Sequence, residues 1–146
     1  MALKEIKVGM TETAKTINDN FKYIAGNDIP PSKATVNAPF SNASGATSFP
    51  MYMVKNGILY VQAVGIINSS ATVSGYNDFL TLPELPTNYP RQDGMVKFVS
   101  STNVFQSAYR AVLTGNKISV WTQAAIAANT AFCNDILVFP LGLGES

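Results

Sequence analysis

Histidine is absent from this chain of 146 residues. Imidazole is the side chain that changes charge near neutral pH, so its absence excludes the usual serine and cysteine triads, histidine general acid–base catalysis and histidine-ligated zinc. The single cysteine, Cys133, excludes an intrachain disulfide and a cysteine-rich zinc site. Because Cys133 precedes the apolar run 136–139, we interpret it as a small buried thiol. We expect no metal site and no cofactor.

Charge is scarce as well. Charged residues make up 13% of the chain, against roughly 25% in ordinary soluble proteins. Lys and Arg number 10 and Asp and Glu number 9, with no run of one sign to follow a phosphate backbone or an anionic lipid surface. We therefore expect neither a nucleic-acid partner nor a membrane partner. Ser, Thr, Asn and Gln together number 41, so hydroxyls and amides coat the surface or other subunits cover part of it.

Long apolar runs are also missing. Residues 1–7 lack the apolar core of a secretion signal, and no stretch approaches the ~18 apolar residues of a membrane span. We therefore expect synthesis and assembly in a cytoplasm. The length fits one domain with an arm, which argues against a two-domain enzyme. Nine scattered carboxylates leave open a glycosidase pair brought together by folding, as the less favoured alternative.

Residues 10–25 predict a short amphipathic helix with a narrow apolar seam. Thr11 is available as its N-cap and Gly26 follows its end. A helix this short is marginal alone in water, so the seam favours association with copies of itself around a symmetry axis. The alternative is a helix packed on its own domain. The seam positions, spaced three, four and three apart, are Ala14, Ile17, Phe21 and Ile24.

The segment 29–50 contains four prolines and almost no charge. Proline excludes a helix, and small polar residues give little to bury. We therefore expect an extended neck in which isolated anchors dock, namely Val36, Phe40 and Phe49.

From residue 51 onward the pattern changes to short β-prone runs separated by turn residues, as in a sandwich or barrel. Asn56-Gly57 predicts a tight hairpin between strands at 51–54 and 58–67. Three prolines exclude a central strand at 82–91. Further strands, which bring the total to about seven, are predicted at 78–82, 95–100, 105–113, 118–124 and 136–141. The predicted fold is mainly β: a short N-terminal helix, an extended neck and a C-terminal antiparallel β-sandwich or barrel head.

A second hairpin, turning at residues 114–117, places Arg110 opposite Trp121, the only tryptophan. Ile118, Val120 and Thr122 share one face of the later strand; Ser119, Trp121 and Gln123 share the other. An indole between a hydroxyl and an amide, opposite a guanidinium, suits a sugar, because the ring covers C–H groups while donors meet hydroxyls. The alternative, given equal weight, is an anchor in a subunit interface.

Two further groups are weaker candidates. Residues 74–78 place Tyr76 next to Asn77 and Asp78, and the blander alternative is a turn in which Asn77 or Asp78 bonds its own backbone. Residues 89–91, Tyr-Pro-Arg, are interpreted as a loop whose tyrosine packs on the head.

Both ends of the chain resemble a known family. Residues 6–10 (Ile-Lys-Val-Gly-Met) and 16–21 (Thr-Ile-Asn-Asp-Asn-Phe) resemble the opening of tail and baseplate proteins of phages that infect Gram-positive bacteria. The strand ending at 81–83, the 88–91 loop, the Gly-Asn-Lys hairpin and the closing strand 137–141 are similar to the β-heads of phage tail-tip and fibre proteins. The nearest family is the receptor-binding proteins of lactococcal-type siphophage baseplates.

The resemblance implies an attachment and trimerisation arm at 1–28, a neck at 29–50 and a head at 51–146. It implies a non-enzymatic homotrimer in the virion tail, held to other baseplate proteins by the arm and binding host cell-wall saccharide. In our interpretation Trp121 stacks on the sugar, Arg110 and Gln123 donate hydrogen bonds, and a phosphate or carboxylate matches the guanidinium. The alternative is a structural baseplate or neck scaffold that binds only virion proteins. The predicted saccharide-binding residues are Trp121, Arg110, Gln123, Ser119, Tyr76 and Asp78.

Overall fold

The computed structural model describes residues 28–43, 50–100, 102 and 105–141. All regular structure in this part of the chain is β, which confirms the predicted β head. The predicted helix 10–25, with its seam of Ala14, Ile17, Phe21 and Ile24, lies outside the described residues. Within them, no helix has the length and apolar character needed to cross a membrane.

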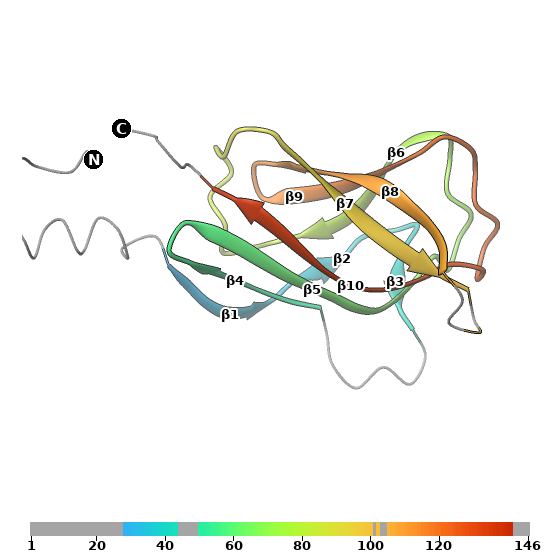
Figure 1. Ribbon diagram of the computed structural model, residues 1–146, viewed down its shortest axis with the longest axis horizontal. Helices are drawn as coiled ribbons and strands as arrows, with labels where there is room; N and C mark the ends of the chain where they lie inside the picture. The colour runs from blue at the N-terminus through green and yellow to red at the C-terminus, as the bar shows by residue number, and fades with distance from the viewer. Residues whose placement is uncertain (1–27, 44–49, 101, 103–104, 142–146) are drawn as a thin grey trace, which may run out of the picture.

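Ten strands form a single antiparallel sheet (Figure 1). They are β1 (Ile29–Lys33), β2 (Thr35–Val36), β3 (Ser41–Asn42), β4 (Met51–Lys55), β5 (Ile58–Ile67), β6 (Gly75–Thr81), β7 (Gln92–Val99), β8 (Phe105–Thr114), β9 (Lys117–Thr122) and β10 (Phe132–Pro140). Along the sheet the order is β1-β4-β5-β10-β7-β8-β9-β6-β2, and β3 pairs with β5. The sheet curls into a nearly closed, barrel-like structure with one core.

The segment 29–36 joins the two ends of this sheet. β1 pairs with β4 at one end and β2 pairs with β6 at the other, although only Ala34 separates them in sequence. Ala34 is buried, and its N–H donates to the carbonyl of Pro50 at 2.8 Å. The described residues 29–43 are extended, as predicted, but they pair with head strands and belong to the sheet.

Aromatic rings from distant segments meet in the core. The ring of Phe40 lies 4.9 Å from that of Phe79 and 5.7 Å from that of Phe98, measured between centroids. Phe98 continues the cluster to Tyr109 at 5.2 Å. Phe40 therefore anchors the proline-rich segment, as predicted, and its edge-to-face contact with Phe79 adds to the stabilisation from buried area.

The hairpins follow their turn residues. Asn56 and Gly57 have φ of 51° and 75°, the left-handed values that a tight turn requires, and β5 occupies the predicted range 58–67. The predicted loop 82–91 contains no strand. Three strands begin earlier than predicted, at residues 75, 92 and 132, because polar residues or glycine interrupt the apolar pattern near their starts, at Asn77, at Asp93 and Gly94, and at Asn134 and Asp135.

Cys133 is fully buried, as predicted. Burial raises the pKa of its thiol, and the nearby carboxylate of Asp135 raises that pKa further. The thiol therefore stays protonated and inert at neutral pH.

Candidate functional site

Four outward-facing side chains form a row across the sheet, which we call the Trp121 row. Tyr76 on β6 pairs with Trp121 on β9, Trp121 pairs with Arg110 on β8, and Arg110 pairs with Met95 on β7. All four are exposed; Tyr76 retains 51% and Trp121 39% of its accessible surface. The row therefore exposes a large apolar surface to solvent. Exposed apolar side chains that gather in one place are typical of a binding surface.

The β8–β9 hairpin positions the centre of the row. Its register is the predicted one, with Leu113 opposite Ile118 and Arg110 opposite Trp121. Ile118 and Val120 are buried while Trp121 is exposed, so the predicted division of faces is confirmed. A two-residue loop closes the hairpin, and Gly115 in it has φ of 60°.

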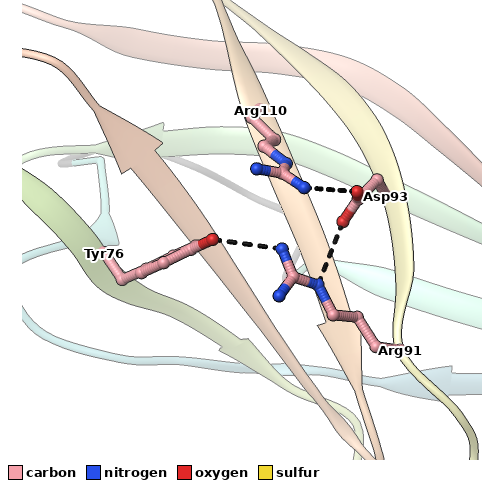
Figure 2. A network of polar contacts seen from close by, with 4 residues as sticks. All are labelled: Tyr76, Arg91, Asp93 and Arg110. Carbon is pink, nitrogen blue, oxygen red and sulfur yellow. Dashed lines mark hydrogen bonds and ion pairs between the residues drawn. The ribbon is translucent and has the colours of Figure 1, made fainter.

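A polar network connects both neighbours of Trp121 (Figure 2). Asp93 accepts hydrogen bonds from two guanidiniums, from Arg110 Nη2 at 2.5 Å and from Arg91 Nε at 3.3 Å. Arg91 also donates through Nη2 to the hydroxyl of Tyr76 at 3.1 Å. Because Arg91 directly precedes β7 and Tyr76 lies on β6, this contact spans the outer face of β8 and β9. The network therefore holds Tyr76 and Arg110 in place on either side of the indole.

The charges of the network stabilise one another. The hydrogen bond from Arg110 is the largest cause that holds the pKa of Asp93 below its usual value; desolvation opposes it, and the hydrogen bond from Arg91 adds to the lowering. Asp93 in turn raises the pKa of Arg110. Arg110 is therefore already paired with a carboxylate of the protein itself. Its guanidinium is less available to a phosphate or carboxylate of a ligand than the sequence alone suggested.

Beside Trp121 the surface is hollowed into an open depression of about 570 Å³, which we call the Trp121 depression. Residues 107–110 of β8 form one side, and residues 123–126, which follow β9, form the other. Arg110 and Gln123, both predicted site residues, lie in its lining together with Trp121. The volume is within the range of small-ligand sites.

Buried polar side chains fix the loop that forms the far side of the depression. Thr72 Oγ1 accepts from Ile126 N–H at 2.8 Å. Asn68 is fully buried; its amide donates to the Ala127 carbonyl at 2.7 Å, and its side-chain oxygen accepts from Ala131 N–H at 3.0 Å. These bonds satisfy the backbone of the loop away from water, so the depression is preformed.

The structure unites two groups that the sequence treated separately. Tyr76 and Asp78 lie on strand β6 and not in a loop, and they face Trp121 and Ser119 across the β6–β9 pair. Between them Asn77 points inward; its side chain accepts from the N–H of Val73 and donates to the carbonyl of Val73, four residues earlier. Asp78 and Ser119 form a neighbouring cross-strand pair beside the Trp121 row, and they do not line the depression.

Sequence reasoning missed Asp93 as a site residue and treated Arg91 only as part of a loop. Tyr89 does pack against the core, as predicted, but Arg91 turns outward into the network. The missed signal was alternation: Asp93 lies two residues before the outward-facing Met95 and shares its face. The predicted strand began at 95, so Asp93 was left off it.

A second exposed apolar group, which we call the outer strip, lies on β4, β5 and β10. Val138 pairs with Tyr60, and Tyr60 pairs with Met53 on its other side. Ile136 shares the outer face of β10 with Val138, and both are more than half exposed. In the described residues, no group of three or more His, Cys, Asp or Glu side chains gathers in a way that could hold a metal ion.

No protein-family model and no curated protein matches the sequence. Among solved structures, the fold is similar to that of a receptor-binding domain of a lactococcal phage, the head domain from phage bIL170. The TM-score is 0.57 at 21% identity, and the match covers 77% of this chain and 98% of that one. Conversely, almost a quarter of this chain has no counterpart in the head domain. The chain therefore has the fold of a lactococcal phage receptor-binding head domain.

Proposed function

We propose that this chain is a phage tail protein whose head binds a saccharide on the host cell surface. The observation that carries the proposal is the exposed Trp121, framed by Tyr76 and Arg110 at the edge of a preformed depression. Aromatic rings next to fixed polar groups are suited to sugars, which present C–H faces and hydroxyl edges. The likeness to a head domain described as receptor-binding supports the same function.

In the proposed site the indole of Trp121 lies against a sugar ring, and the polar groups beside it meet the hydroxyls. A guanidinium has five N–H donors, and the hydrogen bond to Asp93 occupies one of those of Arg110. Gln123 adds an amide donor and acceptor from within the depression. Tyr76, Ser119 and Asp78 extend the surface across β6 and β9, where a longer saccharide chain would lie.

The proposal is one of binding without catalysis. The two carboxylates on this face, Asp78 and Asp93, lie on β6 and β7, with β9 and β8 between them. Three strand spacings amount to about 14 Å, whereas the carboxyl pairs of glycosidases lie roughly 5–10 Å apart. Asp93 is moreover ion-paired with two arginines.

We further propose that the protein acts in the virion as a homotrimer, after synthesis in the host cytoplasm. The arm, residues 1–28, would hold three copies together and attach them to other baseplate proteins. The predicted seam supports this proposal, because three copies bury it without another partner. Several heads on one particle turn weak, roughly millimolar single-site binding into firm attachment through effective concentration.

Calorimetry tests the function. Wall polysaccharides purified from a panel of Gram-positive bacteria, lactococci included, are titrated into the full chain. For the polysaccharide that binds, Trp121→Ala is expected to weaken binding at least about tenfold, because each stacked ring contributes on the order of 1 kcal/mol or more. Light scattering is the control for assembly, with three subunits expected for both proteins. Unchanged binding by an assembled Trp121→Ala protein contradicts the site.

A structural baseplate or neck scaffold is the second candidate, and the outer strip favours it. Exposed Ile136 and Val138 are typical of a surface that contacts protein. This alternative predicts no binding to any wall polysaccharide. It also predicts that Val138→Asp, and not Trp121→Ala, prevents incorporation into particles.

A further inference from the structure

The two sides of the Trp121 depression differ in chemistry. The side towards Trp121 and Arg110 carries the polar network. The other side, after β9, carries the methyl groups of Ala124 and Ala125, with Ile126 next to them, and Ala108 adds a methyl group from β8. Alanine side chains offer no hydrogen bond, so this part of the depression can contribute to binding only by covering apolar atoms of a ligand.

Formal charge in the depression is limited to one group. Among the described residues that line it, Arg110 alone carries a formal charge, and its guanidinium is hydrogen-bonded to Asp93, a carboxylate that also pairs with Arg91. The other polar groups of the lining are the hydroxyls of Ser107 and Tyr109 and the amide of Gln123. An anionic group that approached Arg110 would come close to the Asp93 carboxylate, and like charges at that range repel. This repulsion makes an uncharged ligand the better match for Arg110.

Resting on the proposed saccharide binding, we propose that the sugar unit in the Trp121 depression is uncharged and carries a methyl-bearing substituent. An N-acetyl sugar and a 6-deoxy sugar share this chemistry. The ring lies on Trp121, its hydroxyl edge faces Arg110 and Gln123, and the methyl group covers the alanine side. Removing one methyl group from water changes affinity by about fourfold.

The alanine side is ready to receive the methyl group. Thr72 and Asn68 hold residues 126–131 from beneath through buried hydrogen bonds. The loop therefore needs little ordering when a ligand binds, so little of the binding free energy from the methyl contact is lost to the entropy cost of ordering.

The test uses four glucose derivatives and the single indole N–H signal of the full chain in NMR titrations. The probes are methyl β-glucoside, methyl N-acetyl-β-glucosaminide, methyl 6-deoxy-β-glucoside and glucose 6-phosphate. We expect the N-acetyl or the 6-deoxy glycoside to bind at least about threefold tighter than the glucoside. Tighter binding of the N-acetyl glycoside indicates an N-acetyl sugar as the natural ligand, and tighter binding of the 6-deoxy glycoside indicates a 6-deoxy sugar. Glucose 6-phosphate is expected to bind no tighter than the glucoside.

The outcomes separate this inference from the proposed function. A glucoside that shifts the indole signal and binds as tightly as both methyl-bearing probes overturns the inference and leaves saccharide binding in place. Tightest binding by glucose 6-phosphate also overturns the inference. If none of the four moves the signal, both the inference and the proposed site are overturned.

Serine substitutions provide a matched check. The double substitution Ala124→Ser with Ala125→Ser adds two hydroxyls to the alanine side, and both positions are exposed, so the fold is kept. It is expected to abolish the preference for the methyl-bearing probe while glucoside binding remains. Ala128→Ser, in the same loop but outside the lining, is the control and should keep the preference. A preference that survives the double substitution contradicts the assignment of the alanine side.

Discussion

At the scale of single residues, Asp93 is the group on which the geometry of the site depends. It is exposed, yet both carboxylate oxygens are engaged, one by Arg91 and one by Arg110. Through Arg91 it also orders the hydroxyl of Tyr76. Each bond is exposed to solvent and contributes little to stability. Its role in our account is to restrict the positions of side chains that would otherwise be flexible.

Binding is predicted to be independent of pH between about pH 5 and 8. The pKa of Asp93 is lowered in the folded protein, so the network is present above the usual pKa and is lost only as pH falls through the lowered value. Without histidine, no side chain with an ordinary pKa titrates in that interval. Calorimetry with the bound polysaccharide should show weakening only below about pH 4, and Asp93→Asn should remove that acid dependence. A midpoint near pH 6 contradicts this account.

Gly115, in the turn of the β8–β9 hairpin, is predicted to tolerate alanine less well than Gly75 at the start of β6. Its φ is 60°, and an added Cβ would lie 2.5 Å from the carbonyl oxygen of Thr87. Gly75 also has positive φ but open space around it, so Gly75→Ala adds backbone strain alone. We expect Gly115→Ala to lower the free energy of unfolding by about 3 kcal/mol and Gly75→Ala by about 1 kcal/mol. Chemical denaturation measures both, and equal losses would show that the Thr87 contact is unimportant.

At the scale of elements, the loop after β9 depends on the buried side chain of Asn68. Asn68→Ala removes the side-chain acceptor of the Thr130 and Ala131 N–H groups and one of the two donors to the Ala127 carbonyl, which keeps the Thr130 hydroxyl. We expect a loss of roughly 2–4 kcal/mol in unfolding free energy, together with weaker sugar binding because the alanine side loses its support. Exposed Asn88→Ala is the control, with a change of less than about 0.5 kcal/mol. Full stability of Asn68→Ala would contradict the role of this residue.

Elements that local chemistry determines were predictable from the sequence, whereas those that depend on distant partners were not. Asn56-Gly57 specifies its hairpin within a few residues, and the β8–β9 register follows from alternation, so Arg110 and Trp121 could be paired in advance. β2 forms only because Thr35 pairs with Thr81, a partner 46 positions away. Its short proline-flanked sequence carries no period-two pattern, and it was interpreted as a neck.

The same distinction applies to the site. Tyr76 joins Trp121 through the β6–β9 pairing, and Arg91 reaches Tyr76 across two strands. Neither relation is local in sequence. Sequence analysis could therefore find the residues that flank Trp121 within its own hairpin, but it separated Tyr76 and Asp78 from them and missed Asp93.

At the scale of the whole molecule, the segment 29–36 closes the sheet and also continues into the predicted arm. β1 covers the edge of β4, and β2 covers the edge of β6, which carries Tyr76. An uncovered edge strand exposes unpaired backbone groups that favour aggregation. We therefore propose that the head requires residues that precede residue 51.

Truncation tests this requirement. A fragment of residues 28–146 is predicted to unfold cooperatively, because it keeps both closing strands. A fragment of residues 37–146 lacks β1, β2 and buried Ala34, and we expect it to unfold at least about 10 °C lower or to aggregate. Thermal circular dichroism with limited proteolysis measures both. Equal unfolding temperatures would mean that the segment is dispensable and that the head does begin later.

The low charge of the chain, 13%, fits a molecule with two sparsely charged working surfaces. One is the Trp121 row with its depression, where Asp93 pairs with both Arg91 and Arg110. The other is the outer strip, which we assign to contacts with protein. The two surfaces lie on different strands, so substitutions in one should leave the other unaffected.

Chemical-shift mapping with the wall polysaccharide that binds is the most direct test of the central claim, that a saccharide is bound at Trp121. The account predicts that the indole N–H of Trp121 and the amides of residues 107–110 and 123–126 shift on titration. It also predicts that Met53, Ile136 and Val138 stay unchanged. An unchanged Trp121 indole, with shifts concentrated on the outer strip or elsewhere, would contradict the account.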